Sequence, residues 1–262
     1  MPEILEAETA RLLIEKRALN REIISVDARD AWYLKQGLTP RAARAALPGR
    51  KFVAARRRGK QLFLDTDGDG PVVGFHLGMS GRVVIDDAAA GDPLLYASNR
   101  DVKDWYRFSL GFADGGQIAL RDPRRLGAVV FDADEDRLGP DALELTRDQL
   151  RTAVATSRAP LKAVIMDQHR IAGLGNLLAD EALWRSDLDP ARSANSLTAT
   201  EQARLHRTIR TTLRTLGRRG GSHTGDLMVA RVPGGMCPRD GAPLRRRTVG
   251  GRTTYSCPVH QV

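Results

Sequence analysis

Residues 161–183 read LKAVIMDQHRIAGLGNLLADEAL, and this stretch decides the fold of the second half of the chain. Two helical patterns flank the glycine-containing turn IAGLGN at 171–176. The turn lacks the third glycine of a dinucleotide-binding fingerprint and follows a helix instead of a strand, which excludes that class of fold. A second helix starts at Asn176, and free N–H groups at a helix start suit one phosphate. An ordinary corner between helices is equally compatible with the spacing.

On either side of this stretch, the chain changes character near residue 140. Before it, short runs rich in β-branched and aromatic residues alternate with turn sequences such as DGDG (67–70), AAAGDP (88–93) and DGG (114–116). This pattern predicts a β-sandwich, with a leading helix from Glu3 to about Arg17. After it, helical patterns with Thr or Asn caps and Pro160 at a helix start predict an α-bundle.

The last residues predict a β-hairpin turning at VGG, residues 249–251. We therefore expect an α+β protein in three parts. These are an N-terminal β-sandwich domain at 1–135, a helical domain at 136–232 and a small hairpin domain at 233–262.

The charge balance points to a polyanionic partner. The 262 residues contain 41 Lys and Arg against 32 Asp and Glu, a formal net charge of +9. Such a surplus is typical of nucleic-acid binding, although a merely soluble surface would look the same. Two cysteines exclude a disulfide framework, and no apolar stretch resembles a signal region or a membrane span. We expect a cytoplasmic protein that does not bind membranes.

The hairpin carries the spacing of a metal site. Cys237 and Asp240 stand three residues apart, as do Cys257 and His260, and sixteen residues separate the two pairs. This is the spacing of a zinc ribbon in which an aspartate and a histidine replace two cysteines. We predict one structural Zn²⁺ held by these four residues; the alternative is a hairpin held by packing alone, with two unrelated cysteines.

Two basic stretches lie between predicted strands. RRRGKQL (56–62) places Lys60 at the mouth of a strand, and DPRRLG (122–127) places Arg124 and Arg125 in a tight turn. Loops between strands can carry side chains into a groove. Taken alone, each stretch is more often surface charge.

Together these features resemble the formamidopyrimidine-DNA glycosylase and endonuclease VIII family of base-excision enzymes. The resemblance extends over the whole chain. Its motifs are the MPE start with Glu6, GK at Lys60, HLGMSG at 76–81, DPRRLG at 122–127, the segment 161–183 and GRTTYSCP at 251–258.

The resemblance implies a glycosylase with abasic-site lyase activity on damaged double-stranded DNA, acting as a monomer in the bacterial cytoplasm. Pro2 becomes the nucleophile once Met1 is removed, and an α-amino group with a pKa near 8 is partly neutral at cellular pH. Glu3 handles protons at the sugar ring oxygen, Glu6 supports it, and Lys60 belongs to the same catalytic group.

The resemblance also implies how the DNA is held while the damaged nucleotide is turned out of the helix. Met79 and Arg124 enter the gap that this nucleotide leaves, and Leu126 stands where relatives often have a phenylalanine wedge. Phosphate contacts fall to Lys60, Arg125, Asn176 and Arg252.

Departures from the family pattern bear on the substrate. The segment 220–236, GGSHTGDLMVARVPGGM, leaves little room for the lid that covers 8-oxoguanine in some relatives. We therefore expect abasic sites, oxidised pyrimidines or ring-opened purines to be preferred over 8-oxoguanine opposite cytosine. Two other classes remain open: a non-catalytic protein that binds lesions, and an RNA-binding zinc-ribbon protein. Neither needs Pro2 and Glu3.

Overall fold

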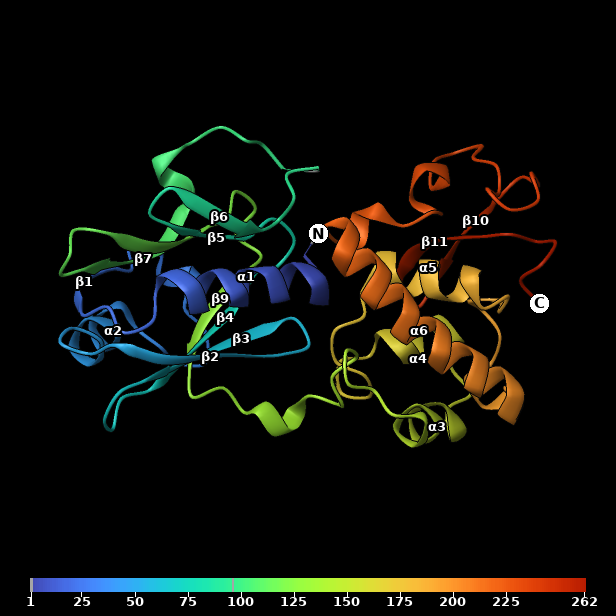
Figure 1. The fold of residues 1–262 in the computed structure, drawn as a ribbon, viewed down its shortest axis with the longest axis horizontal. Coiled ribbons are helices and arrows are strands. Elements are labelled where there is room, and N and C mark those ends of the chain that lie inside the picture. The colour runs from blue at the N-terminus through green and yellow to red at the C-terminus, as the bar shows by residue number, and fades with distance from the viewer. Residues whose placement is uncertain (1, 96) are drawn as a thin grey trace. The chain divides into compact units, whose positions relative to one another are not determined.

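The computed structural model describes residues 2–95 and 97–262, which form two compact units (Figure 1). The first contains Pro2 and Glu6–Glu135, and the second contains Glu3–Leu5 and Asp136–Val262. The predicted α+β class is confirmed, and the first unit contains two antiparallel sheets as the turn pattern predicted. The further division of the second unit after residue 232 remains a prediction.

The first unit packs helix α1 (Ile4–Arg17) with two sheets. Strands of one sheet run in the order β1-β7-β8-β5-β6 and strands of the other in the order β2-β3-β4-β9. Their bounds are β1 Ile23–Asp27, β2 Phe52–Arg58, β3 Gln61–Thr66, β4 Val72–His76, β5 Arg82–Ile85, β6 Ala88–Gly91, β7 Tyr106–Phe112, β8 Gln117–Arg121 and β9 Ala128–Phe131. Alternate residues of β7, among them Phe108, Leu110 and Phe112, are buried in the core, so their neighbours point to the opposite side of the sheet.

Two elements of this unit were not predicted. The AAAG part of the expected turn at 88–93 is strand β6, which pairs with β5 along its whole length. Alanine and glycine are weak strand formers, so this strand forms because it pairs with β5 and not because its residues favour a strand. Helix α2 (Pro40–Ala46) begins with proline after the cap residue Thr39, whose side chain accepts a hydrogen bond from Ala42 N at 3.1 Å.

The second unit consists of four α-helices and a hairpin among its described elements. They are α3 Arg147–Ala155, α4 Leu161–Met166, α5 Asn176–Arg185, α6 Ala199–Arg219, β10 Arg245–Val249 and β11 Arg252–Ser256. The chain after α6 forms two short 3₁₀ turns, Ser222–Thr224 and Met228–Ala230. No helix in the described ranges is long and apolar enough to cross a membrane.

Helix α5 is the centre of this unit. Its residues from Leu177 to Trp184 are all buried, and it contacts α4, α6 and β11. Two of the buried residues are acids, Asp180 and Glu181. Glu181 accepts hydrogen bonds from the backbone N–H groups of Asp226 (3.0 Å) and Leu227 (2.9 Å), which fixes the chain that follows α6.

Candidate active site and metal centre

The carboxylate of Glu3 is held by the start of α5. Its oxygens accept hydrogen bonds from the backbone N–H groups of Gly175 (2.8 Å), Leu177 (2.8 Å) and Leu178 (3.2 Å). The N-cap residue of this helix is Gly175, which has no side chain, so the carboxylate of Glu3 takes the place of the cap. The helix dipole and the N–H donors complement the negative charge, and the Glu3 side chain is fully buried.

The glycines of the IAGLGN turn allow this close approach. A Cβ atom on Gly175 would lie 2.3 Å from the Glu3 carboxyl carbon, and one on Gly173 would lie 2.4 Å from Ile4 Cδ1. Gly173 also has φ +118°. The predicted helix-turn-helix is therefore present, and the N–H groups of Gly175, Leu177 and Leu178 bind a carboxylate of the protein itself.

Pro2 and Glu6 flank residues Glu3–Leu5 in the sequence, and both are buried. Pro2 directly precedes Glu3, and Glu6 lies in the first turn of α1. Lys60 lies in the tight turn between β2 and β3, after Gly59 with φ +60°. The structure thus places Lys60 where the sequence predicted it, at the mouth of a strand.

Asp122 organises the DPRRLG loop. Its Oδ2 accepts hydrogen bonds from the N–H groups of Leu126 (2.9 Å) and Gly127 (2.8 Å), and its Oδ1 accepts one from Arg124 N at 3.1 Å. Ser80, in the loop after β4, also donates to Asp122. One buried carboxylate therefore fixes both loops.

Met79 and Leu126 lie on these two loops, which run next to each other. A Cβ on Gly78 would lie 2.3 Å from the Leu126 carbonyl carbon, so the backbones are in contact. Met79 is 37% exposed and Leu126 is 48% exposed. Exposed apolar side chains on two adjoining, rigidly held loops are typical of a binding surface.

The three predicted phosphate-binding side chains outside Lys60 differ in their surroundings. Arg125 makes a two-pronged ion pair with Asp30, at 2.8 and 2.7 Å, which uses two of its five N–H donors. Asn176 lies at the first position of α5, and its Oδ1 is buried with no hydrogen-bond partner among the described atoms. Arg252 is exposed beside the hairpin turn, where Gly250 and Gly251 both have positive φ.

The four predicted metal ligands come together. One ligand atom from each of Cys237, Asp240, Cys257 and His260 lies within 4.8 Å of all the others. Asp240 Oδ2 lies 2.6 Å from His260 Nδ1 and 3.2 Å from Cys257 Sγ. In a tetrahedral zinc site, ligand atoms about 2.0–2.3 Å from the ion lie about 3.3–3.8 Å apart, so small shifts would admit a metal ion.

Burial and hydrogen bonds tune this cluster. The contact with His260 is the main cause that holds the pKa of the Asp240 carboxyl below its ordinary value. Burial raises the pKa of the Cys257 thiol. Trp184, in the last turn of α5, donates its indole N–H to Cys237 Sγ at 3.3 Å, and its ring meets that of His260 edge to face. Trp184 was not identified from the sequence.

A buried ionic network joins α4, α5 and the hairpin, and the sequence reading missed it. Lys162 Nζ lies 2.7 Å from Asp180 Oδ1 and 2.7 Å from Thr254 Oγ1, and both charged residues are fully buried. Arg231 donates to the other Asp180 oxygen at 2.7 Å. Burial lowers the pKa of Lys162, and Asp180 opposes that effect. Charged residues inside the apolar run 161–183 were the available signal.

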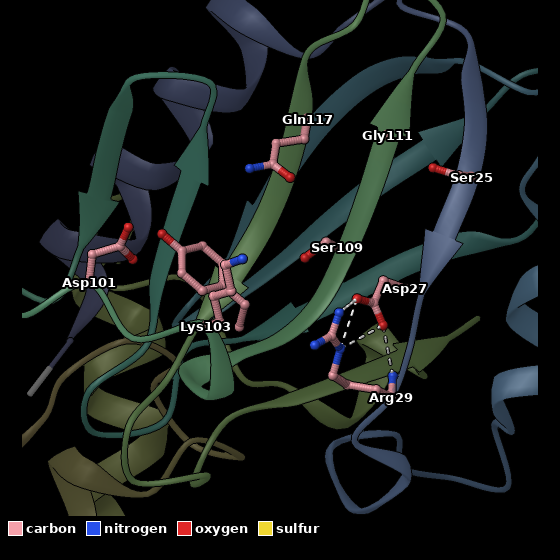
Figure 2. Close-up of a pocket in the computed structure, with 9 residues that line it drawn as sticks. Ser25, Asp27, Arg29, Asp101, Lys103, Ser109, Gly111 and Gln117 are labelled. Atoms are coloured by element: carbon pink, nitrogen blue, oxygen red, sulfur yellow. Dashed lines mark hydrogen bonds and ion pairs between the residues drawn. The ribbon is translucent and has the colours of Figure 1, made fainter.

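A polar hollow of about 360 Å³ lies on the five-stranded sheet (Figure 2). Residues Ser25, Ser109 and Gln117 line it, and Asp27 pairs there with Arg29. Its lining includes none of the predicted site residues, so it is separate from the candidate active site.

Comparison with known proteins gives two family models that match the chain. The model described as "Formamidopyrimidine-DNA glycosylase N-terminal domain" matches residues 1–129, and "Formamidopyrimidine-DNA glycosylase H2TH domain" matches residues 138–226. A formamidopyrimidine-DNA glycosylase of Paracoccus denitrificans is 33% identical over 292 aligned residues, covering 100% of both chains. One from Thermus thermophilus is 32% identical and covers 100% of this chain and 98% of its own.

Solved structures give the same result. The Lactococcus lactis Fpg bound to DNA that contains an oxidised pyrimidine has a TM-score of 0.83 and 27% identity over 99% of both chains. The same enzyme bound to DNA with N7-benzyl-Fapy-dG has a TM-score of 0.83 and 26% identity, again over 99% of both chains.

Proposed function

The chain belongs to the formamidopyrimidine-DNA glycosylase family, and we propose that it excises oxidised or ring-opened bases from duplex DNA and then cleaves the strand by elimination. The observation that carries this proposal is Glu3, buried and held by three backbone N–H groups directly after Pro2. A carboxylate fixed directly after a candidate nucleophile is placed to transfer a proton where that nucleophile reacts.

The proposed chemistry starts at the secondary amine of Pro2 after Met1 has been removed. Its nitrogen forms a bond with the sugar C1′, and the bond between C1′ and the damaged base breaks, with the base leaving as the protonated species. The sugar ring opens, Glu3 transfers a proton at the ring oxygen, and an iminium ion links Pro2 to the sugar. A proton then leaves C2′, its electron pair moves toward the iminium carbon, and the C3′–O bond breaks with the 3′-phosphate as the leaving group. Hydrolysis of the remaining linkage frees the enzyme.

Both units supply residues for DNA contacts in this proposal. In the first, Met79, Arg124 and Leu126 lie on the two loops fixed by Asp122 and would fill the space of the displaced nucleotide. Phosphate contacts are assigned to Lys60, Asn176 and Arg252. Arg125 joins them while it stays paired with Asp30, because that pair uses two of its five N–H donors and leaves Nη1 to bind a phosphate.

The metal cluster fits Zn²⁺, and we propose one structural zinc ion as the resident metal. Two thiolates, an imidazole and a carboxylate form a closed donor set that leaves no position for a substrate. When bound, the ion would cross-link the hairpin to the chain that precedes it. The cross-linked hairpin would hold Arg252 in position next to the hairpin turn. Elemental analysis of untagged protein should find about one zinc per chain, lost in Cys257→Ala.

Borohydride trapping tests the nucleophile. The parent protein should form a stable covalent complex with DNA that carries an abasic site or an oxidised base. Pro2→Gly should lose most strand cleavage and keep its DNA affinity, since the change leaves the contact loops intact. Parental cleavage of abasic DNA by Pro2→Gly would refute the assignment.

The preferred lesion is a finer proposal that rests on the short segment 220–236. Solved relatives bind DNA with abasic sites, oxidised pyrimidines and Fapy derivatives. Single-turnover rates on these lesions should exceed the rate on 8-oxoguanine opposite cytosine, and the opposite order would refute the lid argument. We also propose that the protein acts as a monomer in the cytoplasm of a bacterium.

A further inference from the structure

Helix α6 carries a stripe of arginines that the proposed site does not use. Arg207, Arg210, Arg214 and Arg218 are exposed and follow one another at intervals of three, four and four residues. Residues at such intervals lie on one face of a helix. From Gln202 to Arg219 the sequence contains no Asp or Glu, so no acidic residue of this helix interrupts the stripe. We call these four residues the α6 stripe.

The α6 stripe faces away from the rest of the second unit. The opposite face of α6 is apolar and packs on α3 and α5. The side chains buried on that face are Leu205, Ile209, Thr212, Leu213 and Leu216. Because Asn176 begins α5, and Arg252 begins a strand that also packs on α5, the stripe is turned away from both predicted phosphate contacts.

The stripe is not explained by contacts within the protein. Within residues 2–95 and 97–262, none of its guanidinium groups forms an ion pair or a side-chain hydrogen bond. Like charges at i and i+4, such as Arg210 and Arg214, destabilise a helix. The helix dipole favours cations only in the last turn, so it leaves Arg207 and Arg210 unexplained.

A groove beside the stripe adds further anion-binding groups. It has a volume of about 560 Å³ and runs between α6 and the start of α3. Arg147 of α3 lines it together with three arginines of the stripe, and Thr146 and Thr211 contribute hydroxyl groups. Glu144 is the one acidic residue in this lining. The site therefore presents a strong net positive charge.

The chemistry of the groove favours a nucleic-acid backbone over a protein. Guanidinium groups bind phosphate through two parallel hydrogen bonds. A docked peptide would need aromatic or aliphatic anchors, and the exposed large apolar side chains of the described chain include none from α3 or α6. The stripe runs from Arg207 to Arg218, which is twelve residues and about 16 Å of helix. Over the same length of duplex axis, each strand of B-DNA carries roughly five phosphates, one per about 3.4 Å of axis.

We propose that the α6 stripe and Arg147 form a second binding site for duplex DNA, which contacts only the backbone and is separate from the lesion site. One protein molecule would then hold two DNA segments at once and could pass from one to the other. This inference rests on the proposed function in one respect: it assumes that the polyanion bound by the α6 stripe is duplex DNA.

The test fills the lesion site first and then asks for a second duplex. Protein bound to an immobilised duplex with an abasic-site analogue is mixed with a fluorescent undamaged duplex, and capture of the second duplex is measured over a range of salt concentrations. Arg210→Gln/Arg214→Gln should capture it about tenfold less well, with the slope of log K against log salt reduced by about 1.8 for two lost contacts.

The matched control is Arg41→Gln/Arg44→Gln, which removes two exposed arginines from α2. It should capture the second duplex as the parent does, and Arg210→Lys/Arg214→Lys should restore most capture because the charge remains. Failure of the parent to capture a second duplex, or equal capture by Arg210→Gln/Arg214→Gln, would overturn the proposal. Bridging through a second protein copy would give that equal capture.

Strand cleavage on a separate abasic duplex keeps this result apart from the proposed function. All variants should cleave at the parental single-turnover rate, because none touches Pro2 or Glu3. Cleavage without capture defeats only the second site. Capture without cleavage defeats only the glycosylase and lyase proposal.

Discussion

The two ends of α5 serve two sites by different means. At its start, backbone N–H groups hold the carboxylate of Glu3, and at its end the indole of Trp184 donates to Cys237 in the metal cluster. The first contact uses atoms that nearly every residue has, and the second uses a side chain that one residue type has. Most substitutions of Trp184 therefore remove the second contact, whereas the first is lost only by a change at Glu3, by a proline at a donor position or by a side chain that enters its space.

The largest effect is expected at the start of the helix. In Glu3→Gln an amide NH₂ would face backbone N–H groups, and proton transfer by the carboxylate would be lost. Base removal in single-turnover assays should slow by about 10²–10⁴-fold, more than cleavage of a ready-made abasic site. The control is Glu15→Gln, an exposed change on α1. Equal losses in both steps would show that Glu3 has a broader role.

In the middle of α5, Asp180 forms the buried ion pairs with Lys162 and Arg231, and Asp180→Asn tests how much these pairs stabilise the unit. Lys162 and Arg231 would remain buried without a full counter-charge, which typically costs about 3–5 kcal/mol of unfolding free energy. Urea denaturation measures it. Asp148→Asn, which removes the exposed partner of Arg151, should cost less than about 1 kcal/mol. Similar losses in the two variants would contradict the importance of this network.

At the end of the helix, Trp184→Phe keeps an aromatic ring, although a smaller one, and removes the hydrogen bond to Cys237. Metal affinity measured by chelator competition should fall by about 10–100-fold. With saturating metal, the rate of base removal should stay at the parental value, because the Glu3 contacts are made by other atoms. Trp32→Phe, at a 66% exposed position, is the control. Unchanged metal affinity in Trp184→Phe would mean that its N–H does not support the cluster.

The smallest effect concerns a helix start that is capped locally. In α6, Glu201 and Thr198 form a capping box, and Arg192 is the main cause that lowers the pKa of Glu201 from 4.5 to about 2. Because the folded-state pKa is lowered, this stabilisation is complete above pH 4.5 and is lost as the pH falls through about 2.

Glu201→Gln should therefore cost about 1 kcal/mol of unfolding free energy at neutral pH, and the difference from the parent should shrink in acid. Urea denaturation across this pH range measures it, with the exposed change Glu144→Gln as control. A difference that does not depend on pH would contradict the ion-pair contribution.

The sequence predicted the contacts between residues that are near in the chain better than the contacts between residues that are far apart. The metal cluster was found from spacing alone, because its four side chains come in two local pairs, Cys237 with Asp240 and Cys257 with His260. The capping box of α6 is local in the same way. Glu3 was identified only through resemblance, and its N–H partners were missed since they lie 172 to 175 residues away and carry no side-chain signature.

Two other differences have physical reasons of the same kind. Strand β6 is held by pairing with β5, and a run of three alanines does not by itself predict a strand. The Lys162–Asp180 pair depends on which faces of α4 and α5 meet, and this is set by packing of the whole unit. By contrast, the sheets, the leading helix and the hairpin follow from local patterns and turn residues, and these were predicted.

The attachment of Glu3–Leu5 to the second unit has a consequence for synthesis on the ribosome. Glu3 is made 172 residues before Gly175, whose N–H it will bind. At about 5–20 residues per second, the first residues wait roughly 9–34 s for their partners to emerge. During this time the chain end, which the finished fold buries at Pro2, is open to the removal of Met1 that the proposed mechanism requires. A nascent or truncated chain lacks the N–H groups that position Glu3, so strand-cutting activity would arise only in a completed molecule.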